Sequence, residues 1–132
     1  MQQEVSVYLF LGFLESGKTK FIQETLEDPR MENGENTVLL ICEEGEEEYS
    51  PEKFGVGKVA VVTLENASEL TEENLNAITE KYKAQRVIVE YNGTWLLQQF
   101  FDAMPENWVI NQMMTFFDAN SFLSYNANMR QL

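Results

Sequence analysis

The chain has 132 residues, enough for one domain with a hydrophobic core, and its 22 acidic and 9 basic residues give a net charge of −13. This charge argues against nucleic acid and anionic membranes as partners, because both bind basic surfaces. One cysteine and no histidine exclude an internal disulfide and a zinc site built from the usual nitrogen and sulfur ligands. With no signal-peptide pattern and no membrane-spanning apolar run, we expect a cytoplasmic protein.

The first chemical motif lies between a predicted strand and a predicted helix. Residues 5–11 are a nearly continuous apolar run, which predicts a strand buried on both faces of a parallel sheet. Residues 12–19 read GFLESGKT and fit the phosphate-binding pattern GxxxxGK[ST]. Apolar residues at helical spacing from Phe21 to Leu26 then predict a helix that ends at Asp28. This context favours a nucleotide site over a chance match in a glycine-containing loop.

Each specified residue of this loop has a physical role. Gly12 allows a sharp exit from the strand, and Gly17 lets the backbone approach a phosphate oxygen where a Cβ would intrude. Lys18 would bridge the β- and γ-phosphates, and the Thr19 hydroxyl would be a ligand of Mg²⁺. The backbone amides at the start of the helix would hold the anion.

An acidic run follows the second predicted strand. Residues 37–42 are apolar, and residues 43–48 contain five glutamates. Because ligands bind beyond the carboxyl ends of parallel strands, this run should emerge on the same side of the sheet as the phosphate loop, and Glu43 or Glu44 could hold Mg²⁺. The alternative is a solvated acidic loop.

The next elements are predicted to serve packing. Residues 58–64 are predicted as a third strand. Thr71 then precedes a helix with acidic residues in its first turn, lysines at its end and an apolar face that includes Leu75, Ile78 and Tyr82.

A second chemical motif ends the fourth predicted strand. Residues 86–93 read RVIVEYNG, so Glu90 comes at the carboxyl end of an apolar run, where a Walker B carboxylate lies beside Mg²⁺. Gly93 could offer its backbone N–H to the γ-phosphate and move when that phosphate leaves. The alternative is an ordinary exit from a strand into a loop.

The last third of the chain has few charges. We predict a helix over residues 95–104, a strand over 108–117 and a final helix over 122–132, opened by residues 118–121. A surface with few charges is usually buried against other protein. We therefore expect that missing elements of the domain, a client protein or a second copy in a homodimer cover this third of the chain.

Together these motifs resemble the CobW/HypB/UreG family of P-loop GTPases, and specifically its CobW-like branch. GFLESGKT is similar to the branch's phosphate loop, TVLLICEEGEEE to its second strand and acidic switch, VIVEYNG to its Walker B strand and second switch, and MTFFDAN to the strand that follows. The resemblance implies a three-layer α/β/α P-loop fold with a mostly parallel sheet. It also implies binding of GTP or GDP with Mg²⁺, slow hydrolysis and a link to metal-cofactor assembly.

Three positions depart from the family pattern. There is no cysteine pair after the second strand, where many members carry a metal-binding CxCC motif, and Lys20 replaces the usual threonine or serine for the α-phosphate. The guanine-selecting NKxD motif would lie beyond residue 132, so we expect residues 1–132 to be the N-terminal part of a nucleotide-binding domain that is incomplete at its C-terminus.

The sequence therefore predicts a Mg²⁺-dependent GTP-binding protein with slow hydrolysis. Lys18 and Glu90 are the predicted catalytic residues, and Thr19, Glu90, Glu43 and Glu44 the predicted metal ligands. The predicted nucleotide contacts are Gly12, Leu14, Glu15, Ser16, Gly17, Lys18, Thr19, Lys20 and Gly93. Alternatives are a non-hydrolysing nucleotide-binding or assembly module and an ATP-using P-loop protein.

Overall fold

The computed structural model describes residues 4–12, 18–28, 34–42, 59–64, 66–92, 97–118 and 121–129. In chain order, the elements are β1 (Val5–Gly12), α1 (Lys18–Glu27), β2 (Thr37–Cys42), β3 (Val59–Thr63), the short 3₁₀ helix η3 (Ala67–Glu69), α2 (Glu72–Tyr82), β4 (Arg86–Asn92), α3 (Leu97–Ala103), β5 (Trp108–Asp118) and β6 (Ser121–Met129).

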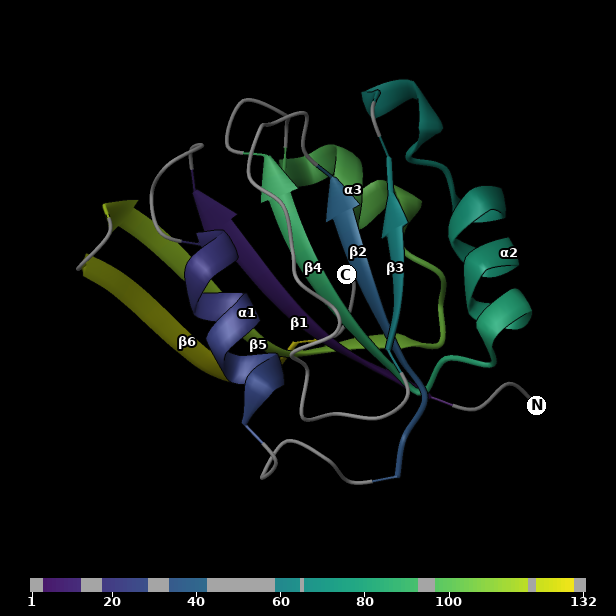
Figure 1. The fold of residues 1–132 in the computed structure, drawn as a ribbon. Coiled ribbons are helices and arrows are strands. Elements are labelled where there is room, and N and C mark those ends of the chain that lie inside the picture. Colours follow the sequence, from purple (N-terminus) through teal and green to yellow (C-terminus); the bar gives the residue numbers. More distant parts are fainter. Residues whose placement is uncertain are drawn as a thin grey trace.

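The strands form one sheet in the order β3-β2-β4-β1-β5-β6 (Figure 1). The first five strands of this order run parallel to one another, and β6 pairs with β5 in the antiparallel direction. The predicted α/β class with a mostly parallel sheet is therefore confirmed. β1 and β4 lie side by side in the middle of the sheet, where both strand edges are paired.

Helices cover both faces of this sheet. In Figure 1, α1 lies in front of the sheet and α3 behind it, with α2 beside the β3 edge. On the α1 face, Ile22 and Leu26 pack against sheet residues that include Phe10, Leu39 and Ile88. The opposite face packs on α2 and α3 through a larger core, which includes Val7, Leu9, Leu40, Val87, Val89, Leu75, Phe100 and Trp108. The alternation of side chains along each strand divides one apolar run between two cores, as expected for a sheet buried on both sides.

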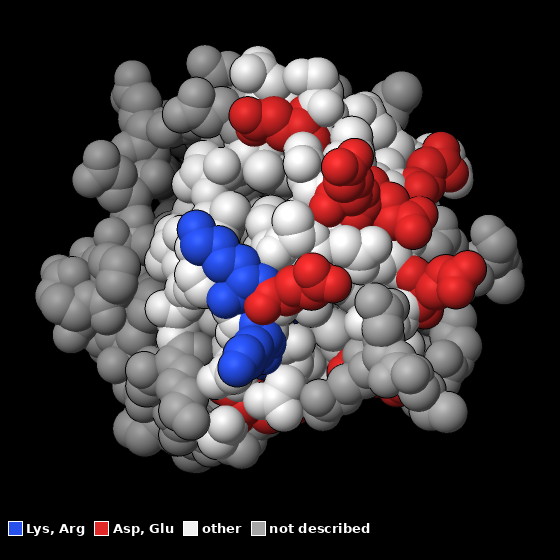
Figure 2. Space-filling model, turned by 90° about the vertical axis from the view of Figure 1, so that its right-hand side faces the viewer, with Lys and Arg blue, Asp and Glu red and all other residues white. Residues whose placement is uncertain are grey.

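Helix α2 has the ends that the sequence predicts. The Thr71 hydroxyl accepts a hydrogen bond from the Asn74 backbone N–H at 3.1 Å, which satisfies a donor that the helix itself leaves open. At the other end, Lys83 adopts a left-handed conformation with φ of 52°. The Leu75 side chain is fully buried. Figure 2, which faces this side of the molecule, shows many acidic side chains around a small basic group.

One predicted element is wrong. Residues 122–132 were expected to form a helix, but Ser121–Met129 is the strand β6. Its register runs antiparallel along β5, from Asp118↔Ser121 to Ile110↔Met129. Only two residues separate the strands, a length typical of a β-hairpin, and pairing satisfies the backbone groups that β5 would otherwise expose at its edge. In the part of the chain that the structure describes, no helix is long and apolar enough to cross a membrane.

Candidate functional site

The two chemical motifs of the sequence meet at one edge of the sheet. β1 and β4 are adjacent and parallel, with Phe10 opposite Glu90 and Gly12 opposite Asn92. The carboxyl ends of both strands therefore lie side by side. Helix α1 begins at Lys18, six positions after Gly12, and Figure 1 shows its first turn close to the end of β1. A strand, a short connection and a helix thus follow one another as the phosphate-loop motif requires.

Glu90 is buried in the centre of this edge. Its residue is only 3% exposed, and the register places it between Phe10 of β1 and Ile41 of β2. Ile88, two residues earlier on the same strand, packs in the core beneath α1. Because side chains alternate along a strand, Glu90 lies on the same face of the sheet as α1. An acidic side chain is seldom buried without a function or a partner, so this position distinguishes Glu90 from the exposed glutamates of α2.

The start of α1 suits an anion. The first turn of α1 contains no acidic residue, so no carboxylate of its own opposes an anion at the positive end of the helix. The structure describes the backbone of Gly12, Lys18 and Thr19 but not the positions of the Lys18 and Thr19 side chains. Their contacts with phosphate and Mg²⁺ stay predictions.

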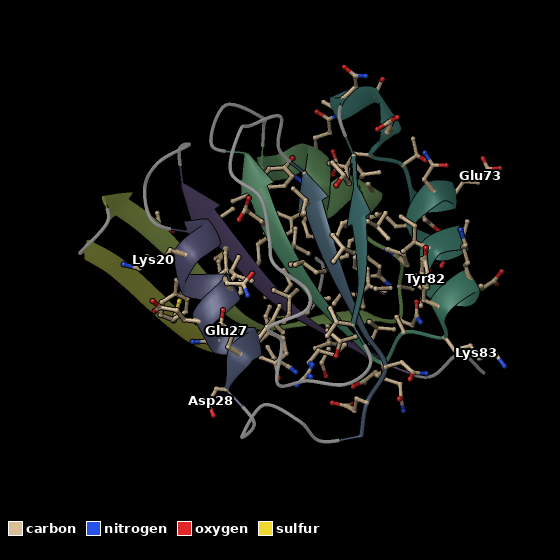
Figure 3. The ribbon with its side chains drawn as sticks, in the orientation of Figure 1. Lys20, Glu27, Asp28, Glu73, Tyr82 and Lys83 are labelled. Atoms are coloured by element: carbon tan, nitrogen blue, oxygen red, sulfur yellow. The ribbon has the colours of Figure 1, made fainter. Side chains whose placement is uncertain are left out.

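Lys20 is the one predicted nucleotide contact whose side chain is described. It is exposed, and in Figure 3 it extends from α1 on the side away from β4. The assignment of Lys20 stays a prediction.

The remaining predicted site residues lie outside the described residues. They are Leu14, Glu15, Ser16 and Gly17 of the phosphate loop, Glu43 and Glu44 of the acidic run, and Gly93 after β4. Within the described ranges, no three histidine, cysteine, aspartate or glutamate side chains are grouped so that they could hold a metal ion. Glu90 is thus the one predicted metal ligand whose side chain can be placed.

A buried pair on the opposite face of the sheet was not singled out from the sequence. Tyr91 is paired with Cys42 in the register of β4 and β2, and both are almost completely buried. The Tyr91 ring contacts Phe100 of α3 edge to face, with a centroid distance of 5.5 Å. Burial raises the pKa of Tyr91 well above its usual value, the neighbouring Cys42 raises it further, and a hydrogen bond with the Phe100 backbone partly opposes both effects. The alternation of strand residues could have indicated that Tyr91 faces away from Glu90.

No protein-family model, no curated protein and no solved structure matches this chain. The evidence for a function therefore comes from the sequence motifs and from the arrangement of β1, β4 and α1.

Proposed function

We propose that this chain is a Mg²⁺-dependent GTP-binding protein of the CobW-like type that hydrolyses GTP slowly. The observation that supports this proposal is the pairing of β1 with β4. It brings the end of the strand before the GxxxxGKT motif next to the strand that carries a buried Glu90. In nucleotide-binding α/β proteins, the residues that bind phosphate and metal lie at the carboxyl ends of the parallel strands.

The chain's own groups would divide the work of binding. Backbone N–H groups at the start of α1 would hold the phosphates, and Lys18 would add a positive charge near the β- and γ-phosphates. With a net charge of −13, the rest of the molecule opposes the approach of an anion. Binding must therefore depend on local groups, and the exposed acidic surface makes nucleic acid and anionic membranes poor partners.

The buried carboxylate fits a magnesium ion. Mg²⁺ prefers oxygen ligands and usually keeps several waters. One carboxylate and the Thr19 hydroxyl are therefore a sufficient contribution from the protein, and phosphate oxygens of the nucleotide would add further ligands. Glu90 lies at the correct edge of the sheet and on the α1 face for this role. When bound, the ion would neutralise part of the charge on the phosphates.

The position of the described arginine supports slow turnover. The only arginine in the described ranges is Arg86, which lies at the amino end of β4. Its Nε donates a hydrogen bond to the Thr37 hydroxyl at 2.9 Å, so its side chain is fixed at the opposite edge from Glu90. An arginine near the γ-phosphate accelerates hydrolysis strongly in related chemistries, and Arg86 is not placed to act in that way.

Isothermal calorimetry of the full chain with GTP, in the presence and absence of Mg²⁺, tests the proposal. We expect Mg²⁺-dependent binding with one nucleotide per chain. Lys18→Ala should weaken it at least about tenfold, because a charge-assisted contact contributes about 1.5–3 kcal/mol. Lys81→Ala removes an exposed lysine from α2 and is the matched control, which should bind as the parent does. Absence of GTP and GDP binding by a folded parent protein would refute the proposal.

Glu90→Gln tests the metal role separately. The change keeps the shape of the side chain and removes its charge, so nucleotide should still bind but the benefit of Mg²⁺ should fall. Glu73→Gln on the exposed surface of α2 is the control for loss of one negative charge. Phosphate release, measured in the same samples with GTP and with ATP, separates the candidates. Binding without release indicates a non-hydrolysing module, and preference for ATP indicates an ATP-using protein.

A further inference from the structure

A pocket lies under α1, on the same face of the sheet as Glu90 but formed by other residues. Its volume is about 260 Å³. The buried side chains of Phe10, Ile22, Ile88 and Met114 contribute to its lining and come from β1, α1, β4 and β5. An engineered apolar cavity of about 150 Å³ holds benzene, so this volume has room for a molecule larger than one aromatic ring.

The rest of the lining is half-buried and partly polar. Tyr8, Phe21, Thr25 and Gln112 line the pocket and are each of intermediate exposure. Tyr8 and Gln112 are paired across β1 and β5, while Phe21 and Thr25 lie one helical turn apart on α1. Mostly apolar walls with a few polar groups are typical of small-molecule sites.

Two contacts indicate what kind of molecule would fit. The rings of Phe10 and Phe21 lie 6.0 Å apart with an interplanar angle of 50°, so the pocket has aromatic surface from both the sheet and the helix. The Thr25 hydroxyl donates its hydrogen to the Phe21 carbonyl oxygen at 2.8 Å. With its one proton committed to the helix, the Thr25 oxygen can offer only acceptor lone pairs to a molecule in the pocket.

We propose that this pocket binds a small bicyclic aromatic molecule that carries one N–H donor. Its rings would contact the Phe10 and Phe21 side chains, and its N–H would donate to Thr25 Oγ1. A ligand without a donor would leave that hydroxyl oxygen without the added hydrogen bond, and a charged ligand would lose its hydration against apolar walls. The inference rests on the pocket alone and does not require the proposed nucleotide activity.

Indole is the probe for the first experiment, because it is bicyclic and has one N–H donor. The full chain is prepared with ¹³C-labelled methionine methyl groups and titrated with indole. We expect a saturable shift of the Met114 signal and no shift of Met104, which is buried in the core on the other face of the sheet. A flat Met114 signal up to the solubility limit of indole would overturn the proposal. Equal shifts at Met104 and Met114 would also overturn it, because they would indicate non-specific binding.

A second comparison tests the hydrogen bond to Thr25. Thr25→Val keeps the shape of the side chain and removes the acceptor, so it should weaken indole binding by about three- to tenfold. The affinity for 1-methylindole, which has no N–H, should be the same in the parent and in Thr25→Val, and this controls for any change in the pocket itself. If both ligands lose affinity equally, or if indole loses none, the proposed donor contact is wrong. A Met114 shift that depends on protein concentration without ligand would overturn the proposal in favour of a second copy as the occupant.

Discussion

At the scale of single residues, Glu90 and Tyr91 show that neighbouring positions of one strand lie in different environments, because their side chains face opposite sides of the sheet. Glu90 faces α1 and the candidate site, while Tyr91 faces Phe100 in the core on the other side. Burial disfavours the charged form of the phenol and raises its pKa. The native state therefore holds the Tyr91 proton more tightly than the unfolded chain does.

This difference predicts how stability changes with pH. Free tyrosine has a pKa of about 10, so the contribution of Tyr91 is complete below that pH and is lost progressively as the pH rises above it. Tyr91→Phe removes the titrating group and should flatten the alkaline decrease of the unfolding free energy, measured by urea denaturation across that range. Tyr82→Phe, at a half-buried position on α2, is the control for the loss of a phenol hydroxyl. An unchanged slope in Tyr91→Phe would contradict the prediction.

At the scale of elements, the end of α2 stores a small amount of strain. Lys83 has φ of 52°, and its backbone N–H bonds to carbonyl oxygens of Thr79 and Glu80. A left-handed conformation costs a residue with a Cβ about 1–2 kcal/mol, and glycine avoids that cost at the price of a more flexible unfolded chain. Lys83 is exposed and its side chain points into solvent in Figure 3, so little packing would be lost on its removal.

Lys83→Gly should therefore raise the free energy of unfolding, by about 0.5–1 kcal/mol after the cost in the unfolded chain is included. Lys81→Gly is the matched control within the last turn of α2, where the backbone is helical. It should lower the free energy of unfolding by about 1 kcal/mol. Both values come from urea or thermal denaturation. The same sign of change in the two variants would show that the backbone conformation at Lys83 is not what matters.

The elements also show which sequence signals are sufficient for prediction. Residues 5–11 and 37–42 were predictable as buried strands, because an uninterrupted apolar run fits a sheet that is covered on both faces. The helix after Thr71 was predictable from its capping residue and spacing. The strand Ser121–Met129 was not, because its apolar and small residues fit a short helix equally well and its structure depends on pairing with β5. Likewise, the position of Glu90 at a strand end was readable, whereas the pocket beneath α1 depends on residues from four separate elements.

At the scale of the whole molecule, excess negative charge is the dominant electrostatic feature. The chain carries 22 acidic and 9 basic residues, and Figure 2 shows acidic side chains spread widely over the α2 side. Like charges repel more in the compact state than in the unfolded chain, so this charge opposes folding. Salt screens such repulsion, and the Debye length falls from about 30 Å at 0.01 M to about 10 Å at 0.1 M ionic strength.

We therefore expect the thermal midpoint of unfolding to rise when sodium chloride is increased from about 0.01 M to about 0.1 M. The midpoint can be followed by circular dichroism at neutral pH without nucleotide. Potassium chloride is the control, because screening depends on ionic strength and the two salts should raise the midpoint equally. Magnesium chloride at the same ionic strength, added together with GTP, separates screening from binding, since a further rise that Glu90→Gln abolishes would come from the proposed metal site. A midpoint that falls with added sodium chloride would mean that attractive pairs outweigh the net repulsion in the folded chain.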